Sequence, residues 1–417
     1  MQNQQIIDFL NKRDYDIRKS HNARWIDQKC TCDVLSIIAD CILEYTNYDM
    51  QVEFCISDIW NSQYTKENVL AIFAKPDTDS QFARNEYDKF FSQPINLLVY
   101  SGILGFQGKN GNTNIFTIEN LALLEFIMRR DTNALTFLIL YIQKVLQDSG
   151  IYKEFEDFLD KQDKIHFKKL KETFTNFTIA STPINQSVEC GRIFTKILNP
   201  LAFNLHKKGT RKGNLSNTII TFDELKYNRI NWRDELSGKD KQLTRQEYGQ
   251  YAPLQANAYY NVQKSKRIVR RYNDSVNGGF SEVKQQTEQV PATQIHHIFP
   301  ASEFPRISDF VENLIALTPN QHFSMAHPNN QTSYIDKDFQ YICLLAKTAT
   351  IMQDFTQIYS FGNYKFVLNE GLSTNEFDLV GDLDFATLLS KIDLFYSPFD
   401  KNKYAALIGD NKPIKAI

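Results

Sequence analysis

The sequence lacks the features that mark several large classes of protein. No stretch approaches 18 consecutive apolar residues, the length that a membrane-spanning helix needs. The N-terminal segment MQNQQIIDFLNKRDYDIRK has neither the apolar core nor the layout of a signal peptide. No Gly-rich phosphate loop of the Walker type is found, and no Ser or Cys nucleophile motif stands out. We therefore expect a cytoplasmic protein that has no membrane partner and does not drive translocation with ATP.

Cysteine is scarce and follows no pattern. None of the six cysteines belongs to a CxxC pair. Scattered thiols fit a reducing cytosol better than a disulfide framework. The six are Cys30, Cys32, Cys41, Cys55, Cys190 and Cys343.

The chain also lacks an overall basic charge, since its formal net charge is −2 over 417 residues. Positive charge is nevertheless concentrated in one part of the sequence. Residues 205–275 hold fifteen Lys and Arg against seven Asp and Glu, an excess of eight positive charges interleaved with aromatics. Such a local patch can bind phosphates, although a charge run can also be a solvated face. The DNA-contact candidates here are Lys207, Lys208, Arg211, Lys212, Lys264, Lys266, Arg267, Arg270 and Arg271, with Lys264 to Arg271 expected closest to the cleaved backbone.

The length predicts two or three domains. In residues 1–117, apolar spacing predicts helices over 31–46, 65–73 and 82–100, and a short extended piece over 54–59. An Asn110-Gly111 turn between apolar runs then predicts a hairpin. This order is typical of a winged helix, whose third helix would enter the major groove through Arg84, Asn85 and Lys89. Winged helices also serve as dimerisation or protein-contact modules, so that alternative stays open.

The expected fold class is α+β, in three regions. A mostly helical, winged-helix-like DNA-binding domain covers 1–117, and a helical connector or dimerisation region covers 118–190. A basic DNA-contacting segment and a C-terminal ββα-metal nuclease domain cover 191–417, with the nuclease core at 290–350. The polar stretch within residues 1–30, which includes Arg18 and Lys19, is either a solvated arm or a contact to the DNA backbone.

Histidine is rare but concentrated, because four of the seven lie within the 34 residues 294–327. His296 and His297 are adjacent in an apolar run, and His322 and His327 lie near an expected short helix. Adjacent residues on a strand point to opposite faces, so one can bind a metal while its neighbour faces a water. This arrangement suits phosphodiester hydrolysis at one divalent metal. The alternative is a set of buried core histidines, with Asn313 as a simple turn residue.

The order His296-His297, Asn313, His322 resembles the HNH (ββα-metal) nuclease family over about 35 residues. The resemblance implies that His296 and His322 bind metal, that His297 is the general base, and that Asn313 holds the hairpin loop so that the base is oriented. In some members a second helix histidine also binds metal, for which His327 is the candidate. Many members carry Cys pairs that bind a structural zinc, whereas Thr318 and Gln321 stand at the corresponding positions.

The layout of the whole chain is similar to that of type II restriction endonucleases with an HNH catalytic domain. This implies site-specific cleavage of double-stranded DNA to 5′-phosphate ends, a homodimer, and a cognate DNA methyltransferase in the same system. The cofactor expected first is Mg²⁺, with Mn²⁺, Ni²⁺ or Zn²⁺ as alternatives because imidazole suits transition metals. Two other functions stay open. One is a nuclease specific for methylated DNA, which would need an aromatic pocket for a flipped base. The other is a non-catalytic winged-helix regulator with a structural metal site.

Overall fold

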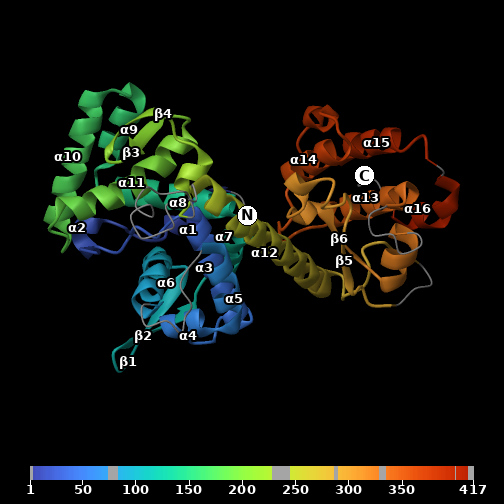
Figure 1. The fold of residues 1–417 in the computed structure, drawn as a ribbon, viewed down its shortest axis with the longest axis horizontal. Coiled ribbons are helices and arrows are strands. Elements are labelled where there is room, and N and C mark those ends of the chain that lie inside the picture. The colour runs from blue at the N-terminus through green and yellow to red at the C-terminus, as the bar shows by residue number, and fades with distance from the viewer. Residues whose placement is uncertain are drawn as a thin grey trace. The chain divides into compact units, whose positions relative to one another are not determined.

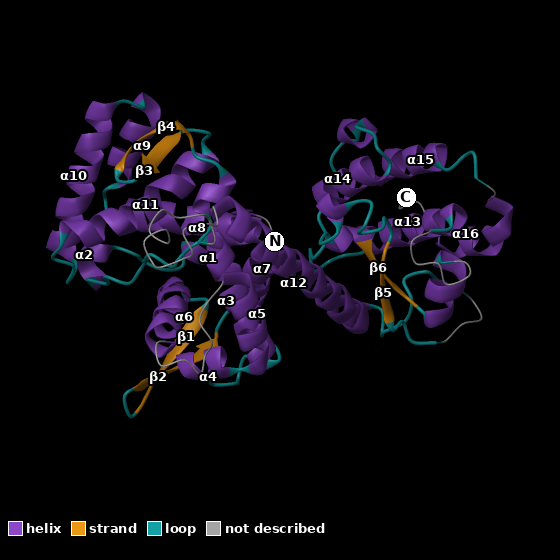
Figure 2. Ribbon diagram, viewed as in Figure 1, coloured by secondary structure: helices purple, strands orange, loops and turns teal. Residues whose placement is uncertain are grey.

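The computed structural model describes residues 3–73, 83–227, 245–285, 290–327, 335–399 and 401–411. These residues are mostly helical and include three two-stranded antiparallel sheets (Figures 1 and 2). The α+β class is confirmed in this coarse form. Contacts divide the chain into two compact units, Met1–Ala256 and Asn257–Ile417. The region boundaries expected at residues 117 and 190 were placed by the roles of the segments. The division by contacts does not test them, and they stay predictions.

The first part of the N-terminal unit has the expected order of helices followed by a hairpin. The expected extended piece over 54–59 is wrong beyond Phe54, which pairs with Phe116 as an isolated bridge. A helix begins at Ile56 because Asp58 accepts a hydrogen bond from the backbone N–H of Cys55 (2.8 Å) and caps the first turn. The elements are α3 (Cys32–Thr46), α4 (Ile56–Asn61), α5 (Gln63–Phe73), α6 (Ala83–Ser101), β1 (Leu104–Asn110) and β2 (Thr113–Ile118).

The rest of this unit is helical up to a second hairpin. Apolar residues recur at helical spacing in α8, where Phe137, Tyr141 and Val145 are fully buried. Part of the predicted basic segment, residues 205–227, packs in this unit. The elements are α7 (Leu121–Arg129), α8 (Asp131–Asp148), α9 (Tyr152–Lys161), α10 (Lys164–Ser181), α11 (Ser187–Asn204), β3 (Lys208–Arg211), β4 (Asn214–Ile219) and the 3-10 turn η1 (Phe222–Leu225).

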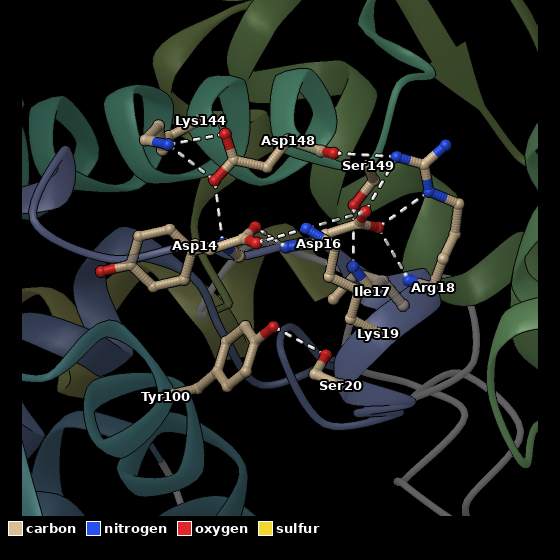
Figure 3. Close-up of polar contacts among 11 residues, drawn as sticks. Asp14, Asp16, Ile17, Arg18, Lys19, Ser20, Tyr100, Lys144, Asp148 and Ser149 are labelled. Atoms are coloured by element: carbon tan, nitrogen blue, oxygen red, sulfur yellow. Dashed lines mark hydrogen bonds and ion pairs between the residues drawn. The ribbon is translucent and has the colours of Figure 1, made fainter.

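The N-terminal arm, with α1 (Asn3–Leu10) and α2 (Ile17–Ser20), is anchored through its backbone, while the side chains of Arg18 and Lys19 remain exposed (Figure 3). The backbone N–H of Tyr15 donates to Asp148 (2.8 Å), and its buried hydroxyl donates to the carbonyl of Ser101 (2.9 Å). Arg18 is paired with Asp16 (2.8 Å), and Lys19 is paired with Asp14 (2.6 Å). The arm is therefore fixed to the end of α8, and these two cations form ion pairs at the surface.

The C-terminal unit is built around a hairpin backed by a buried helix. Strand β5 (Gln294–His297) pairs with β6 (Leu314–Leu317), so that His296 faces Ile315 and His297 faces Leu314. Behind them lies α13 (Lys337–Met352), which is buried along most of its length. The other elements are α12 (Arg245–Val276), which continues from the first unit, η3 (Pro305–Ile307), η4 (Val311–Asn313), η5 (Gln321–Ala326), α14 (Phe361–Gly371), η7 (Glu376–Leu379), α15 (Phe385–Phe395), η8 (Lys401–Tyr404) and α16 (Ala405–Asn411).

A buried ion pair fixes the hairpin to the helix behind it. Lys347 of α13 lies 2.6 Å from the carboxylate of Glu282, and their side chains are 0% and 3% exposed. Glu282 also accepts a hydrogen bond from the backbone N–H of Ala316 in β6 (2.9 Å). Burial lowers the pKa of Lys347, and the carboxylate beside it acts in the opposite direction.

Removing the lysine of this pair should destabilise the protein strongly. We expect Lys347→Met to lower the free energy of unfolding by about 3–5 kcal/mol, because it leaves a buried carboxylate without its cation. Adding Glu282→Gln should recover part of that loss. The exposed Lys337→Met on the same helix is the matched control and should change stability by less than about 0.5 kcal/mol. Urea unfolding measures all four proteins, and similar losses for Lys347→Met and Lys337→Met would contradict the prediction.

Candidate metal centre

Three imidazoles converge at the end of the β5–β6 hairpin. His296 comes from β5, and His322 and His327 come from the turn that follows β6. One ring nitrogen from each lies within 4.8 Å of the others, close enough for a single ion to contact all three. His296 and His327 are buried, and His322 is half-buried. Within the described residues, this is the group of His, Cys, Asp and Glu side chains whose geometry could hold a metal ion.

The backbone of η5 is what brings His322 and His327 together. In an α-helix, residues five apart point about 140° away from each other, given about 3.6 residues per turn. Here η5 is a single π-helical turn, and the N–H of His327 donates to the carbonyl of His322 (3.2 Å). The wider turn returns to the same side after about five residues, and such turns are frequent at functional sites.

Two of the three imidazoles, His296 and His322, have the protonation state that a metal ligand needs. Burial lowers the pKa of His296 well below its usual value, and that of His322 to about 4; neighbouring histidines add to both shifts. These two rings are therefore neutral at pH 7 and offer a lone pair. Nδ1 of His322 is buried and has no hydrogen-bond partner in the part of the chain that the structure describes. A bound cation would satisfy this atom, so the donor set fits a metal.

His297 lies outside the three-histidine group, as expected for the neighbour on the opposite face of a strand. Its Nε2 is 2.9 Å from the carbonyl oxygen of Ser308. Because a carbonyl can only accept, Nε2 carries the hydrogen and Nδ1 keeps the lone pair. Burial lowers the pKa of His297, the charge of Lys266 lowers it further, and the bond to Ser308 opposes both. Sequence reasoning missed Ser308, because it contributes a backbone carbonyl and any residue type could supply one.

Asn313 is fully buried and bridges the loop between the two strands. Its side-chain oxygen accepts from the N–H of Phe299 (2.8 Å), and its amide donates to the carbonyls of Phe299 (3.0 Å) and Ile307 (3.2 Å). These bonds fix residues on both sides of the loop that contains Ser308. Asn313 therefore acts on the orientation of His297 through the backbone, not by direct contact.

Thr318 and Gln321 are linked by hydrogen bonds that reach back to the segment before β5. The side-chain oxygen of Gln321 accepts from the N–H of Thr318 (3.1 Å) and from the hydroxyl of Ser281. Its amide donates to the carbonyl of Val283 (3.0 Å). Hydrogen bonds thus join the segment before β5 to the start of η5.

The basic end of α12 packs against the same hairpin. The hydroxyl of Ser265 donates to the carbonyl of Asp309, and Arg270 donates to the carbonyl of Thr293 (2.7 Å), just before β5. Lys266 lies between these anchors and is half-buried. Its positive charge is one of the causes that lower the pKa of His296, His297 and His322.

The other residues predicted to contact DNA differ in solvent exposure and in whether their charge is already paired. Lys264 is buried against the ring of Tyr260, and Arg267 is half-buried. In the N-terminal unit, Arg211 is tied to Glu224 (2.7 Å) and Thr218 (2.6 Å), which limits its reach. The exposed candidates are Lys89, Lys212, Arg270 and Arg271. Lys207 and Lys208 are half-buried. The side chains of Arg84 and Asn85 lie outside the described residues.

Comparison with known proteins gives no relative, since no family model, curated protein or solved structure matches this chain. None of the described helices combines the length and the apolar character needed to cross a membrane. A function must therefore be argued from the residues of the site.

Proposed function

We propose that this protein is a metal-dependent DNA endonuclease of the HNH type, with one active site per chain. The observation that carries the proposal is the convergence of His296, His322 and His327 next to His297, whose ring is held with its Nδ1 lone pair free. If the three histidines only packed in the core, no imidazole with a fixed tautomer would be needed beside them. A structural metal site would have a closed ligand set, whereas the three ligands found among the described residues leave a position open.

The chain's own residues can carry most of the chemistry. His297 accepts a proton from water at Nδ1, and the water oxygen attacks phosphorus as the P–O3′ bond breaks, leaving a 3′-hydroxyl and a 5′-phosphate. Asn313 and the carbonyl of Ser308 keep the ring oriented during this transfer. The Lys266 ammonium is suited to hold a non-bridging phosphate oxygen. A metal bound by the three histidines would supply Lewis-acid stabilisation of the leaving oxygen.

The donor set changes the order of the expected metals. Mg²⁺ prefers carboxylate, carbonyl and water oxygens, while imidazole suits zinc and other transition metals. The group formed by His296, His322 and His327 contains no carboxylate. We therefore rank Zn²⁺, Ni²⁺ and Mn²⁺ above Mg²⁺, which was the first expectation from the sequence.

The proposed substrate is double-stranded DNA, cut at specific sites in a restriction-modification system with a cognate methyltransferase. The helices and hairpin of the N-terminal unit support a winged-helix-like reading domain, and the basic end of α12 supports contacts to phosphates beside the site. One site per chain implies that two copies act to cut both strands, either as a homodimer or by pairing on DNA.

Incubation with unmethylated phage DNA and Mg²⁺, Mn²⁺, Ni²⁺ or Zn²⁺ tests the proposal. Discrete fragments with 5′-phosphate ends are the expected result. Cleavage of methylated DNA alone would identify a modification-dependent nuclease. Binding without cleavage of either substrate would contradict a nuclease and favour a regulator.

Lys266 gives a further test of the site. We expect Lys266→Gln to slow single-turnover cleavage by about 10- to 100-fold, since a hydrogen bond to a charged group contributes about 1.5–3 kcal/mol. Lys266→Arg should keep part of the rate. The exposed Arg271→Gln, five residues further along α12, is the control and should change DNA affinity more than rate. A loss of metal binding in Lys266→Gln would instead indicate a structural role.

A further inference from the structure

The N-terminal unit contains the same succession of elements twice (Figure 1). Four helices, α3 to α6, lead into the β1–β2 hairpin and are followed by α7. Four more, α8 to α11, lead into the β3–β4 hairpin and are followed by η1. Equivalent elements begin 96 to 104 residues apart, for example Cys32 and Asp131, Ala83 and Ser187, and Leu104 and Lys208.

The sequence carries a trace of this repeat where each second strand ends. Residues 115–121 read IFTIENL, and residues 219–225 read IITFDEL, 104 positions later. Ile, Thr and Leu recur at the same places, Glu119 matches Asp223, and Phe116 and Ile118 match the apolar Ile220 and Phe222. Each helix before a hairpin also contains an internal proline, Pro94 in α6 and Pro200 in α11.

The packing of the two copies is equivalent as well. In each copy the last helix packs on the first strand of its hairpin, α6 on β1 and α11 on β3, and the first helix packs on the last, α3 on α6 and α8 on α11. The first helices of the two copies, α3 and α8, pack on each other. Each hairpin turns at a glycine with positive φ, Gly111 (61°) and Gly213 (78°). The unit is therefore a tandem of two helix–hairpin modules.

The second hairpin is better suited than the first to meet phosphates. Residues 205–219 contain four Lys or Arg and no Asp or Glu, while residues 102–118 contain Lys109 as their one charged residue. Lys212 is exposed in the β3–β4 turn, and Lys109 is exposed on β1. The ammonium of Lys171 from α10 donates to the carbonyl of Gly213 (2.7 Å) and adds positive charge at the base of that turn.

We propose that the second module, α11 with the β3–β4 hairpin, is a DNA-binding module equivalent to the first. One chain then contacts two stretches of duplex DNA. The two modules have different side chains, so they read different bases, and the stretch of DNA read by one chain has no two-fold symmetry. A stretch that is palindromic by itself would require identical surfaces on its two halves, which the two different modules of one chain do not provide. The inference takes its ligand, DNA, from the proposed function, but it concerns binding by the N-terminal unit.

Hydroxyl-radical footprinting of the full-length protein with the metal chelated tests binding without cleavage, on DNA selected from a random pool. Wild type should select a sequence that is asymmetric within the stretch contacted by one chain, and should protect a separate patch for each module. Lys109→Gln and Lys212→Gln should each weaken one patch and lower the salt dependence of log K by about 1, and together by about 2. The exposed Lys12→Gln, in the turn after α1, is the control and should change neither patch.

The outcomes separate this inference from the nuclease proposal. If Lys212→Gln behaves like Lys12→Gln while Lys109→Gln weakens binding, or if the stretch read by one chain is itself palindromic, the second module does not read DNA. Two module-specific patches in a protein that never cleaves would support the inference and contradict the nuclease. Cleavage by a protein in which only one module protects DNA would support the nuclease and contradict this inference. A protein that binds no DNA would overturn both proposals.

Discussion

Replacing His297 with alanine should reduce the rate of DNA cleavage by about 10²- to 10⁴-fold, the usual contribution of a general base. The reason is the hydrogen bond from Nε2 to Ser308, which leaves Nδ1 as the one nitrogen able to take a proton from water. No other imidazole of the site can replace it, because the remaining three converge on one another. Single-turnover cleavage at saturating protein measures this chemical step directly.

A measurement of metal binding distinguishes the loss of the general base in His297→Ala from a loss of folding. His297 lies outside the three-histidine group, so His297→Ala should bind Zn²⁺ or Co²⁺ with unchanged stoichiometry in a calorimetric titration. His166→Ala is the matched control, since His166 lies on α10 of the other unit and pairs with Asp163. Cleavage by His297→Ala at the rate of His166→Ala would rule out a general base at this position.

Local patterns in the sequence predicted much of the fold. The helices α3, α5 and α6 and the first hairpin lie close to their expected limits, because apolar spacing and an Asn-Gly turn are local signals. The start of α4 was missed because its cap, Asp58, forms a structure that competes with the apolar run read as a strand. The repeat was missed because the two modules share a succession of elements and hardly any identical residues.

The site was predictable in its residue types but not in its geometry. The order of His296, His297, Asn313 and His322 pointed to one place, and all of them lie at the β5–β6 hairpin and the turn after it. The π-helical turn that adds His327 has no signal in helical periodicity. Long-range partners were equally hidden: Ser281 reaches Gln321 across 40 positions, and Lys266 approaches the histidines from 30 or more positions earlier in the chain.

Arg211 shows that the long-range partners of charged residues are hidden in the sequence as well. In the sequence it belongs to a basic cluster and counts as a free cation. In the fold its guanidinium meets Glu224, which also caps η1 through Thr221. A charge count along the chain therefore overestimates the number of cations available to DNA, and the exposed Lys212 next to it is the better candidate.

Removing one metal ligand should abolish both metal binding and cleavage. We expect His322→Ala to lower metal affinity by more than about 100-fold, since even changes behind the ligands cost about 10- to 100-fold. The loss of cleavage should be at least as large as in His297→Ala, because the Lewis acid contributes several kcal/mol. His296→Ala and His327→Ala should behave alike if all three imidazoles bind one ion.

The Co²⁺ absorption spectrum and calorimetry of each variant distinguish a ligand from a core residue. His322 is half-buried, so its loss should cost less folding stability than the loss of the buried His296, although both should lose the metal. A variant that loses stability but keeps its metal affinity would show that the imidazole only packs. If His327→Ala kept both its affinity and its activity, the π-helical turn would serve the fold alone. The metal would then rest on two histidines, and other donors would have to complete its coordination.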